Sequence, residues 1–168
     1  VNETGLEDFI NAVEAEYTLS DTSVVDVSAG EIARIGAYFA LPELPERNDA
    51  KFQATLSDSA FAAFVKHNTI SHKIDGYVAT TISLKPIGGI PGDASSAQML
   101  AIADLADKYS SGEIRISHNQ NIVLPHVVKD DLHDLWLALS ELGLATANIG
   151  LITDIIACPG LDYCALAT

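Results

Sequence analysis

Both cysteines of this 168-residue chain lie close to its C-terminus, with five residues between them, in the run Cys158-Pro-Gly-Leu-Asp-Tyr-Cys164. Thiolates are soft ligands that suit zinc and iron–sulfur centres. Two thiolates at this spacing can bind one cluster, but most iron–sulfur clusters need four. The pair therefore predicts part of a metal site.

Three other interpretations of Cys158 and Cys164 remain open at this point. A disulfide between them is geometrically feasible, but a reducing cell disfavours it. A zinc site would need two more ligands, and the histidines are distant in sequence and lack zinc-finger spacing. The cysteines can also be ordinary core residues of a non-enzymatic binding module, because free cysteine is often buried.

Composition excludes several classes of protein. The net charge of −14 argues against nucleic acid and anionic membranes as partners, because either would need a basic face. Two cysteines do not make a disulfide scaffold, so we expect a cytoplasmic location. No apolar run approaches transmembrane length. The chain begins without Met and stops four residues after Cys164, so we expect an internal fragment of a longer protein.

Residues 1–75 are predicted to be a helical connecting segment with little chemistry. Apolar residues recur at helical spacing from Leu6 to Tyr17, and Ser28 followed by Glu31 predicts the start of a second helix. His67 and His72 follow a third predicted helix, and we interpret them as solvated or capping groups. His118 is interpreted as a solvated turn residue, while His126 and His133 show no partner at ligand spacing.

Residues 76–143 predict a compact β-α-β-β-α unit. The expected strands are 77–84, 113–117 and 121–127. One expected helix is capped by Asp93 and buries a stripe of Met99, Ile102, Ala103, Ala106 and Tyr109, and the other spans 129–142. Two helices on one face of a small antiparallel sheet give an α+β, ferredoxin-like fold. Pro125 is expected to make the last strand an edge or to end its pairing.

The pleat of the strand at 113–117 places one of only three arginines. If Ile114 and Ile116 face the helices, Arg115 projects from the other face, near Gln120 in the following turn. Arg115 is then either a solvated side chain or a cation placed for a carboxylated or anionic ligand.

Taken together, three blocks resemble the siroheme-dependent nitrite and sulfite reductases over roughly residues 70–168. They read Ile82-Ser-Leu-Lys-Pro-Ile-Gly-Gly-Ile-Pro-Gly-Asp93, Glu113-Ile-Arg-Ile-Ser-His-Asn-Gln-Asn-Ile-Val-Leu-Pro125 and Ala157-Cys-Pro-Gly-Leu-Asp-Tyr-Cys-Ala-Leu-Ala167. That family pairs ferredoxin-like half domains with siroheme and iron–sulfur domains. The resemblance implies that residues 144–168 begin such a domain.

The resemblance also implies roles for individual residues. Cys158 and Cys164 look like the first cysteine pair of the family, which holds two corners of a 4Fe–4S cluster. Arg115 and Gln120 match positions that approach the siroheme and its carboxylates. Lys85 is a weaker candidate, because a lysine at the end of a strand is usually solvated. Asn119 stands where the first half domain of the family has an anion-binding arginine, so this chain resembles the second half domain.

By resemblance, the parent protein is expected to reduce sulfite to sulfide with six electrons, and the alternative is nitrite to ammonia. Its expected partners are the rest of the parent chain, with the first half domain and a second cysteine pair, and an electron donor that is a ferredoxin or a flavoprotein. Two thiolates cannot complete a four-cysteine cluster, so the chain alone is expected to hold neither cofactor and to be inactive. A gene that continues with a Cys-x3-Cys pair would favour the reductase over the binding module.

Overall fold

The computed structural model describes residues 4–20, 26–40, 42–158, 160–162 and 164–167. The chain divides into two compact units, Val1–Pro42 and Glu43–Thr168. Residues 43–75 thus pack with the predicted half domain. The domain boundaries that the sequence predicts at residues 75 and 143 stay predictions. No described helix is both long and apolar enough to cross a membrane.

The first unit contains two helices, α1 (Leu6–Leu19) and α2 (Ala29–Ala37), and neither has a buried residue. Ser28 caps α2 as predicted, because its hydroxyl oxygen accepts a hydrogen bond from the Glu31 N–H at 3.2 Å. The apolar stripe of α1, which includes Phe9 and Val13, is about half exposed.

The second unit is built on a four-stranded antiparallel sheet with the order β1-β2-β4-β3. Its strands are β1 (Thr69–Ser71), β2 (Tyr77–Ile82), β3 (Arg115–Ile116) and β4 (Ile122–Val128). Both β2 and β3 run antiparallel to β4, which lies between them. The helix between β2 and β3 therefore crosses over in a split β-α-β arrangement, which confirms the predicted α+β, ferredoxin-like class.

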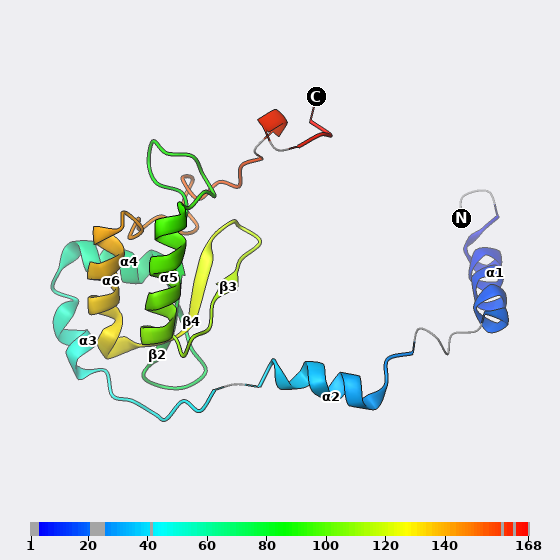
Figure 1. The fold of residues 1–168 in the computed structure, drawn as a ribbon, viewed down its shortest axis with the longest axis horizontal. Coiled ribbons are helices and arrows are strands. Elements are labelled where there is room, and N and C mark those ends of the chain that lie inside the picture. Colours follow the sequence, from blue (N-terminus) through cyan, green and yellow to red (C-terminus); the bar gives the residue numbers. More distant parts are fainter. Residues whose placement is uncertain (1–3, 21–25, 41, 159, 163, 168) are drawn as a thin grey trace. The chain divides into compact units, whose positions relative to one another are not determined.

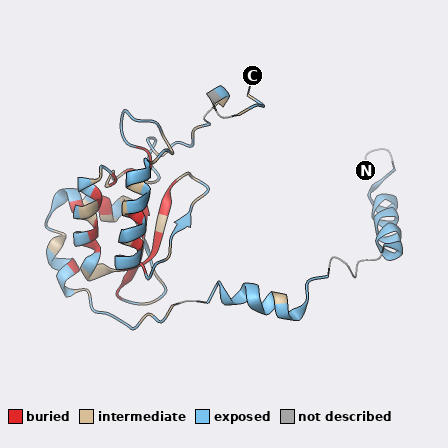
Figure 2. Cartoon of the chain, in the orientation of Figure 1, coloured by how far each residue is buried: buried red, intermediate tan, exposed pale blue. Residues whose placement is uncertain are grey.

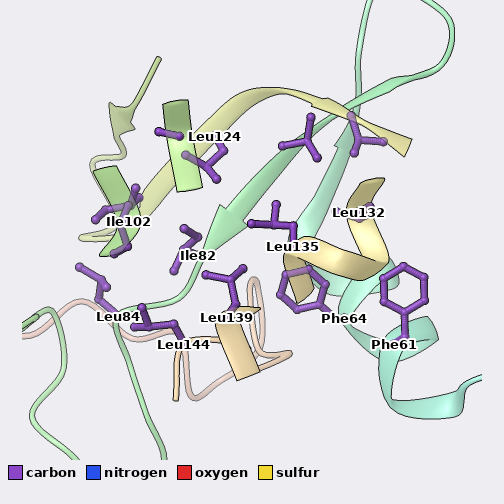
Figure 3. Packing of buried hydrophobic residues seen from close by; sticks show 14 of the residues in the cluster. Phe61, Phe64, Ile82, Leu84, Ile102, Leu124, Leu132, Leu135, Leu139 and Leu144 are labelled. Atoms are coloured by element: carbon purple, nitrogen blue, oxygen red, sulfur yellow. The ribbon is translucent and has the colours of Figure 1, made fainter. Parts of the chain in front are cut away.

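Helices supply the other half of the core, and Figure 1 shows them beside the sheet. They are α3 (Ala50–Thr55), α4 (Ser59–Asn68), α5 (Ser96–Tyr109) and α6 (Leu132–Glu141), with short 3-10 turns at Lys129–Asp131 and Gly160–Asp162. One apolar cluster joins β2 and β4 to α4, α5 and α6, and Figure 3 shows Ile82 and Leu124 of the sheet with the helical Leu135 and Phe64. Burial concentrates in these central elements (Figure 2).

Two local expectations for α5 were wrong. Its cap is Ser95 rather than Asp93, because Ser95 and Gln98 form a reciprocal capping box. Met99, expected to be buried, is 48% exposed, while Ile102 and Ala106 are buried as expected. The start of the helix at Ser96 also leaves residues 86–95 as a longer loop.

The expectation that Ile114 and Ile116 pack under the helices was also wrong, because Ile116 is 72% exposed. The strand β3 has only two residues at the border of the sheet, where little of the chain covers it. Ile116 still pairs with the buried Ile122, so Arg115 does project from the opposite face.

Pro125 interrupts the ladder without placing β4 at an edge. Pairing with β3 ends at Val123, and the register with β2 shifts opposite the interval between Val78 and Thr80. The shift fits a residue that has no N–H to donate. The next residue, His126, donates its N–H to the Ser110 hydroxyl at 3.1 Å instead.

Gly76, just before β2, gives a test of this packing. It has a φ of +84°, and a Cβ there would collide with the backbone of Arg47. Gly143 has a φ of +69° with open space around it. We expect Gly143→Ala to lower the free energy of unfolding by about 1–2 kcal/mol from backbone strain alone. Gly76→Ala should lower it by about 2–5 kcal/mol, because overpacking adds to the strain. Equal losses in chemical denaturation would contradict the close approach of Arg47.

Candidate functional site

Three stretches that are distant in sequence meet at one end of the sheet. They are the residues after β2 around Lys85, the turn before β4 around Gln120, and the start of the cysteine segment, by which we mean residues 153–158, 160–162 and 164. The loop after β2 also approaches, because a Cβ on Gly92 would touch Gln120 at 3.4 Å. The structure thus brings Lys85 and Gln120 to the segment that carries Cys158.

Gln120 is hydrogen-bonded to the backbone of the cysteine segment. Its amide nitrogen donates to the Ala157 carbonyl at 2.7 Å, and its amide oxygen accepts from the Ala157 N–H at 3.0 Å. These two bonds reproduce the paired exchange of an antiparallel ladder. Gln120 itself has a φ of +59°, which turns the chain sharply between β3 and β4. The residue that follows Ala157 is Cys158, so this clamp fixes the backbone directly before the first thiol.

Lys85 forms a buried ion pair with the same segment. Its ammonium lies 2.6 Å from the Asp154 carboxylate, and the two side chains are only 2% and 4% exposed. The ammonium also donates to the Asn119 carbonyl. Lys85 is therefore not solvated at the end of a strand, which the sequence offered as the alternative to a cofactor contact. A buried pair of this kind is maintained only when further hydrogen bonds satisfy the remaining atoms.

Those further hydrogen bonds are present around Asp154. One carboxylate oxygen also accepts from the Asn121 amide at 2.9 Å, and the other accepts from the Gly150 N–H at 3.0 Å. Burial alone would raise the pKa of Asp154, but the Gly150 N–H, the Lys85 ammonium and the Asn121 amide together hold the pKa below its ordinary value. Asp154 is therefore ionised at neutral pH.

Two asparagines complete this corner of the molecule. Asn121 accepts from the Leu84 N–H at 3.2 Å, so it links β2 and β4 to Asp154. Asn148 donates to the carbonyls of Lys85 at 3.1 Å and Thr153 at 3.3 Å. Sequence reasoning missed Asp154, Asn121 and Asn148. The one available signal was a single acid, Asp154, at the start of the apolar run that leads to Cys158.

The two thiols remain available for chemistry. Cys158 is exposed, Cys164 is partly buried, and both are free. The short turn at Gly160–Asp162 separates them, and the Cys164 N–H donates to the Gly160 carbonyl at 2.9 Å. Within the described ranges, no three or more potential ligands gather to hold a metal ion. Two accessible soft donors thus fit part of a thiolate-bound cluster, and other ligands would have to complete it.

Arg115 lies apart from this corner. Its side chain is 56% exposed, and it forms an ion pair with Glu113 at 2.6 Å. None of the described hydrogen bonds connects Arg115 with Lys85 or Gln120. On the other side of β3, Ile116, Met99 and Gln120 contribute to an apolar cavity of ≈ 330 Å³.

Comparison with known proteins places these features in context. Residues 75–142 match the family model described as "Nitrite/Sulfite reductase ferredoxin-like half domain". No solved structure matches the chain significantly.

Several curated proteins are similar to part of the chain. A chloroplastic ferredoxin–nitrite reductase of Zea mays is 39% identical over 79 residues, which are 45% of this chain and 14% of the relative. An assimilatory ferredoxin-dependent nitrite reductase of Haloferax mediterranei is 34% identical over 104 residues, 60% of this chain and 16% of the relative. A protein named sulfite reductase (ferredoxin) 2, of Mycolicibacterium paratuberculosis, is 30% identical over 102 residues, 58% of this chain and 18% of the relative. The matched part is therefore less than a fifth of each of these relatives.

The buried ion pair gives a prediction with a matched control. We expect Lys85→Met to lower the free energy of unfolding by about 3–5 kcal/mol, because it leaves the Asp154 carboxylate buried without its cation. Lys51→Met removes a pair of similar length, 2.8 Å to Asp134, but both its side chains are about half exposed. That control should cost at most about 1 kcal/mol in urea denaturation. Equal costs would show that Lys85 and Asp154 are not buried together.

The pH dependence of the same variant has a defined sign. The pKa of Asp154 lies below its ordinary value of 3.8, so the unfolded chain binds more protons in acid. The stabilisation that ionised Asp154 provides is complete above pH 3.8, and it is lost as the pH falls through the lower pKa of Asp154 in the folded chain. As the pH is lowered below about 4, the free energy of unfolding of Lys85→Met should therefore fall less than that of the unmodified chain.

Proposed function

We propose that this chain, which belongs to the nitrite/sulfite reductase family through its ferredoxin-like half domain, connects that half domain to a cluster site in a siroheme-dependent reductase. The observation that carries the proposal is the docking of the cysteine segment on the half domain. Gln120 is hydrogen-bonded to Ala157, and Lys85 pairs with Asp154. The backbone that leads to Cys158 is therefore anchored at one end of the sheet.

In this proposal the two cysteines hold two corners of a 4Fe–4S cluster. Thiolates are the usual protein ligands of such clusters, and Cys158 and Cys164 are free. When bound, the cluster and the siroheme supply the electron transfer that no side chain can perform. The buried pair and the Gln120 clamp then act as supports that hold the thiols in place.

Arg115 is the proposed contact for the siroheme carboxylates. Its side chain is 56% exposed, and its guanidinium offers the planar donors that bind carboxylates well. Gln120 was expected from the sequence to approach the same cofactor, and Lys85 was the weaker candidate. Both side chains have hydrogen bonds to the cysteine segment, so we propose that they support the cluster ligands.

The substrate is proposed as a small oxyanion. Sulfite, reduced to sulfide, is the first candidate from the sequence, and nitrite, reduced to ammonia, is the second. Nitrite is supported by the nitrite reductases of Zea mays and Haloferax mediterranei among the relatives. The names of these two proteins and of the Mycolicibacterium paratuberculosis sulfite reductase also support ferredoxin as the electron donor.

The 168-residue polypeptide by itself should carry neither cofactor. It has two cysteines, and a four-cysteine cluster needs two more. After anaerobic reconstitution with iron and sulfide, we expect no labile sulfide above that of a Cys158→Ser/Cys164→Ser control. With siroheme added, we expect no siroheme absorbance to remain with the polypeptide after gel filtration. A reconstituted chain that retains both cofactors would refute this prediction.

The full-length reductase that contains this chain tests the proposed function itself. With a dye reductant we expect turnover of sulfite, nitrite or both, and the ratio of the two kcat/KM values identifies the preferred substrate. Cys158→Ser should abolish the cluster and the turnover, whereas the neighbouring Thr153→Ala should leave both unchanged. A full-length protein without a siroheme spectrum would support the binding module instead.

A further inference from the structure

Two histidines for which the sequence predicted no partner, His72 and His126, belong to one series of hydrogen-bonded side chains in the structure. His72 Nε2 lies 3.2 Å from His126 Nδ1, and His126 Nε2 lies 2.9 Å from a carboxylate oxygen of Glu113. The other oxygen of Glu113 accepts from Arg115 Nε at 2.6 Å. His72 is therefore bonded rather than simply solvated, and His126 has a partner on each side.

The direction of these hydrogen bonds is fixed at both ends. The Ile74 N–H donates to His72 Nδ1 at 3.0 Å, so the proton of a neutral His72 must be on Nε2. His72 then donates to His126 Nδ1, which places the His126 proton on Nε2, facing Glu113. At the other end, an ionised carboxylate can only accept. A donor at one end and an acceptor at the other thus select one tautomer for each histidine.

The charge states agree with this direction. Burial lowers the pKa of His72, and the neighbouring His126 lowers it further. Burial would raise the pKa of Glu113, but the hydrogen bonds from Arg115 and His126 outweigh it and hold the pKa below its ordinary value. A second proton on either ring would place two donors opposite each other at His72–His126 or at Ile74–His72.

The chain of bonds crosses the whole sheet. His72 follows β1, His126 lies in β4, and Arg115 belongs to β3 at the far edge, so the contact between the two histidines spans β2. His126 is 3% exposed. It therefore supports Glu113 from a rigid part of the fold, whereas β3 itself has only two paired residues.

We propose that Glu113 and His126 are positioning residues that orient the Arg115 guanidinium toward a carboxylate-bearing ligand, with His72 selecting the tautomer that makes this possible. The proposal rests on the proposed function, in which that ligand is siroheme. Glu113 occupies Nε and one terminal nitrogen of Arg115 through a single oxygen. Among the described contacts, the remaining terminal nitrogen has no partner, so its donors are left for the ligand. His126 holds the second oxygen of Glu113 and prevents the carboxylate from rotating away.

The first part of the test needs no cofactor. Nitrogen-15 NMR of the 168-residue chain near neutral pH should show both His72 and His126 as neutral Nε2–H tautomers. The exposed His118, which has no hydrogen bond among the described contacts, should show the averaged signals of both tautomers and serves as the internal control. An Nδ1–H tautomer at His72 or His126 would overturn the proposed series of hydrogen bonds.

The second part uses the full-length reductase and a double-mutant cycle with siroheme occupancy as the readout. Arg115→Ala should weaken siroheme retention by roughly tenfold, as expected for a lost hydrogen bond to a charged group. His126→Leu should weaken it by a similar factor. The double variant should lose no more than Arg115→Ala alone, because His126 acts through Arg115.

Control variants separate positioning from a purely structural role. His126→Gln keeps a donor at the reach of Nε2 and should restore most of the occupancy, while His118→Gln should change nothing. Additive losses in the double variant, or no rescue by His126→Gln, would overturn the positioning role. If Arg115→Ala leaves occupancy unchanged while the tautomers are as expected, the proposed contact between Arg115 and siroheme fails instead. Should His126→Leu not fold, His126→Gln and the tautomers still decide the question.

Discussion

The buried ion pair between Lys85 and Asp154 is the constraint on which the rest of the candidate site depends. Removing two charges from water costs several kcal/mol per ion, and attraction offsets this only where every remaining polar atom is bonded. Here the Asn121 amide, the Gly150 N–H and the Asn119 carbonyl meet that requirement. Because these partners come from two strand ends and from the segment that follows the last helix, the pair forms only when the half domain and the cysteine segment are assembled together.

The sequence predicted the elements whose patterns are local. Strands β2 and β4 and helices α5 and α6 were expected from alternation and helical spacing, and the α+β arrangement followed from their order. The short β1 was missed, because three residues give too little alternation to recognise. The cap of α5 was misplaced because Asp93 and Ser95 are both good capping residues, and only the reciprocal bond to Gln98 distinguishes them.

The candidate site was harder to predict from the sequence, because its contacts join residues that are far apart in the chain. Lys85 and Asp154 are separated by 69 positions, and His72 and His126 by 54. No spacing rule connects such residues, so His126 looked isolated and Lys85 looked solvated. Residue type supplied what could be inferred: thiols, an arginine on a strand and an amide in a turn were singled out for their chemistry. Their partners became visible only in the folded structure, because residues such as Asp154 and Ala157 belong to no strand or helix.

The supports around the thiols share one property that bears on function. Gln120 binds the Ala157 backbone, and Lys85 binds the Asp154 side chain and backbone. The turn before Cys164 is likewise held by a backbone bond to Gly160. None of these described bonds uses a sulfur atom, so the backbone directly before Cys158 is anchored while both thiols stay free. A core cysteine would gain stability from being enclosed, whereas Cys158 is exposed on an anchored backbone. This combination of a fixed main chain and a free donor is what a cluster ligand requires.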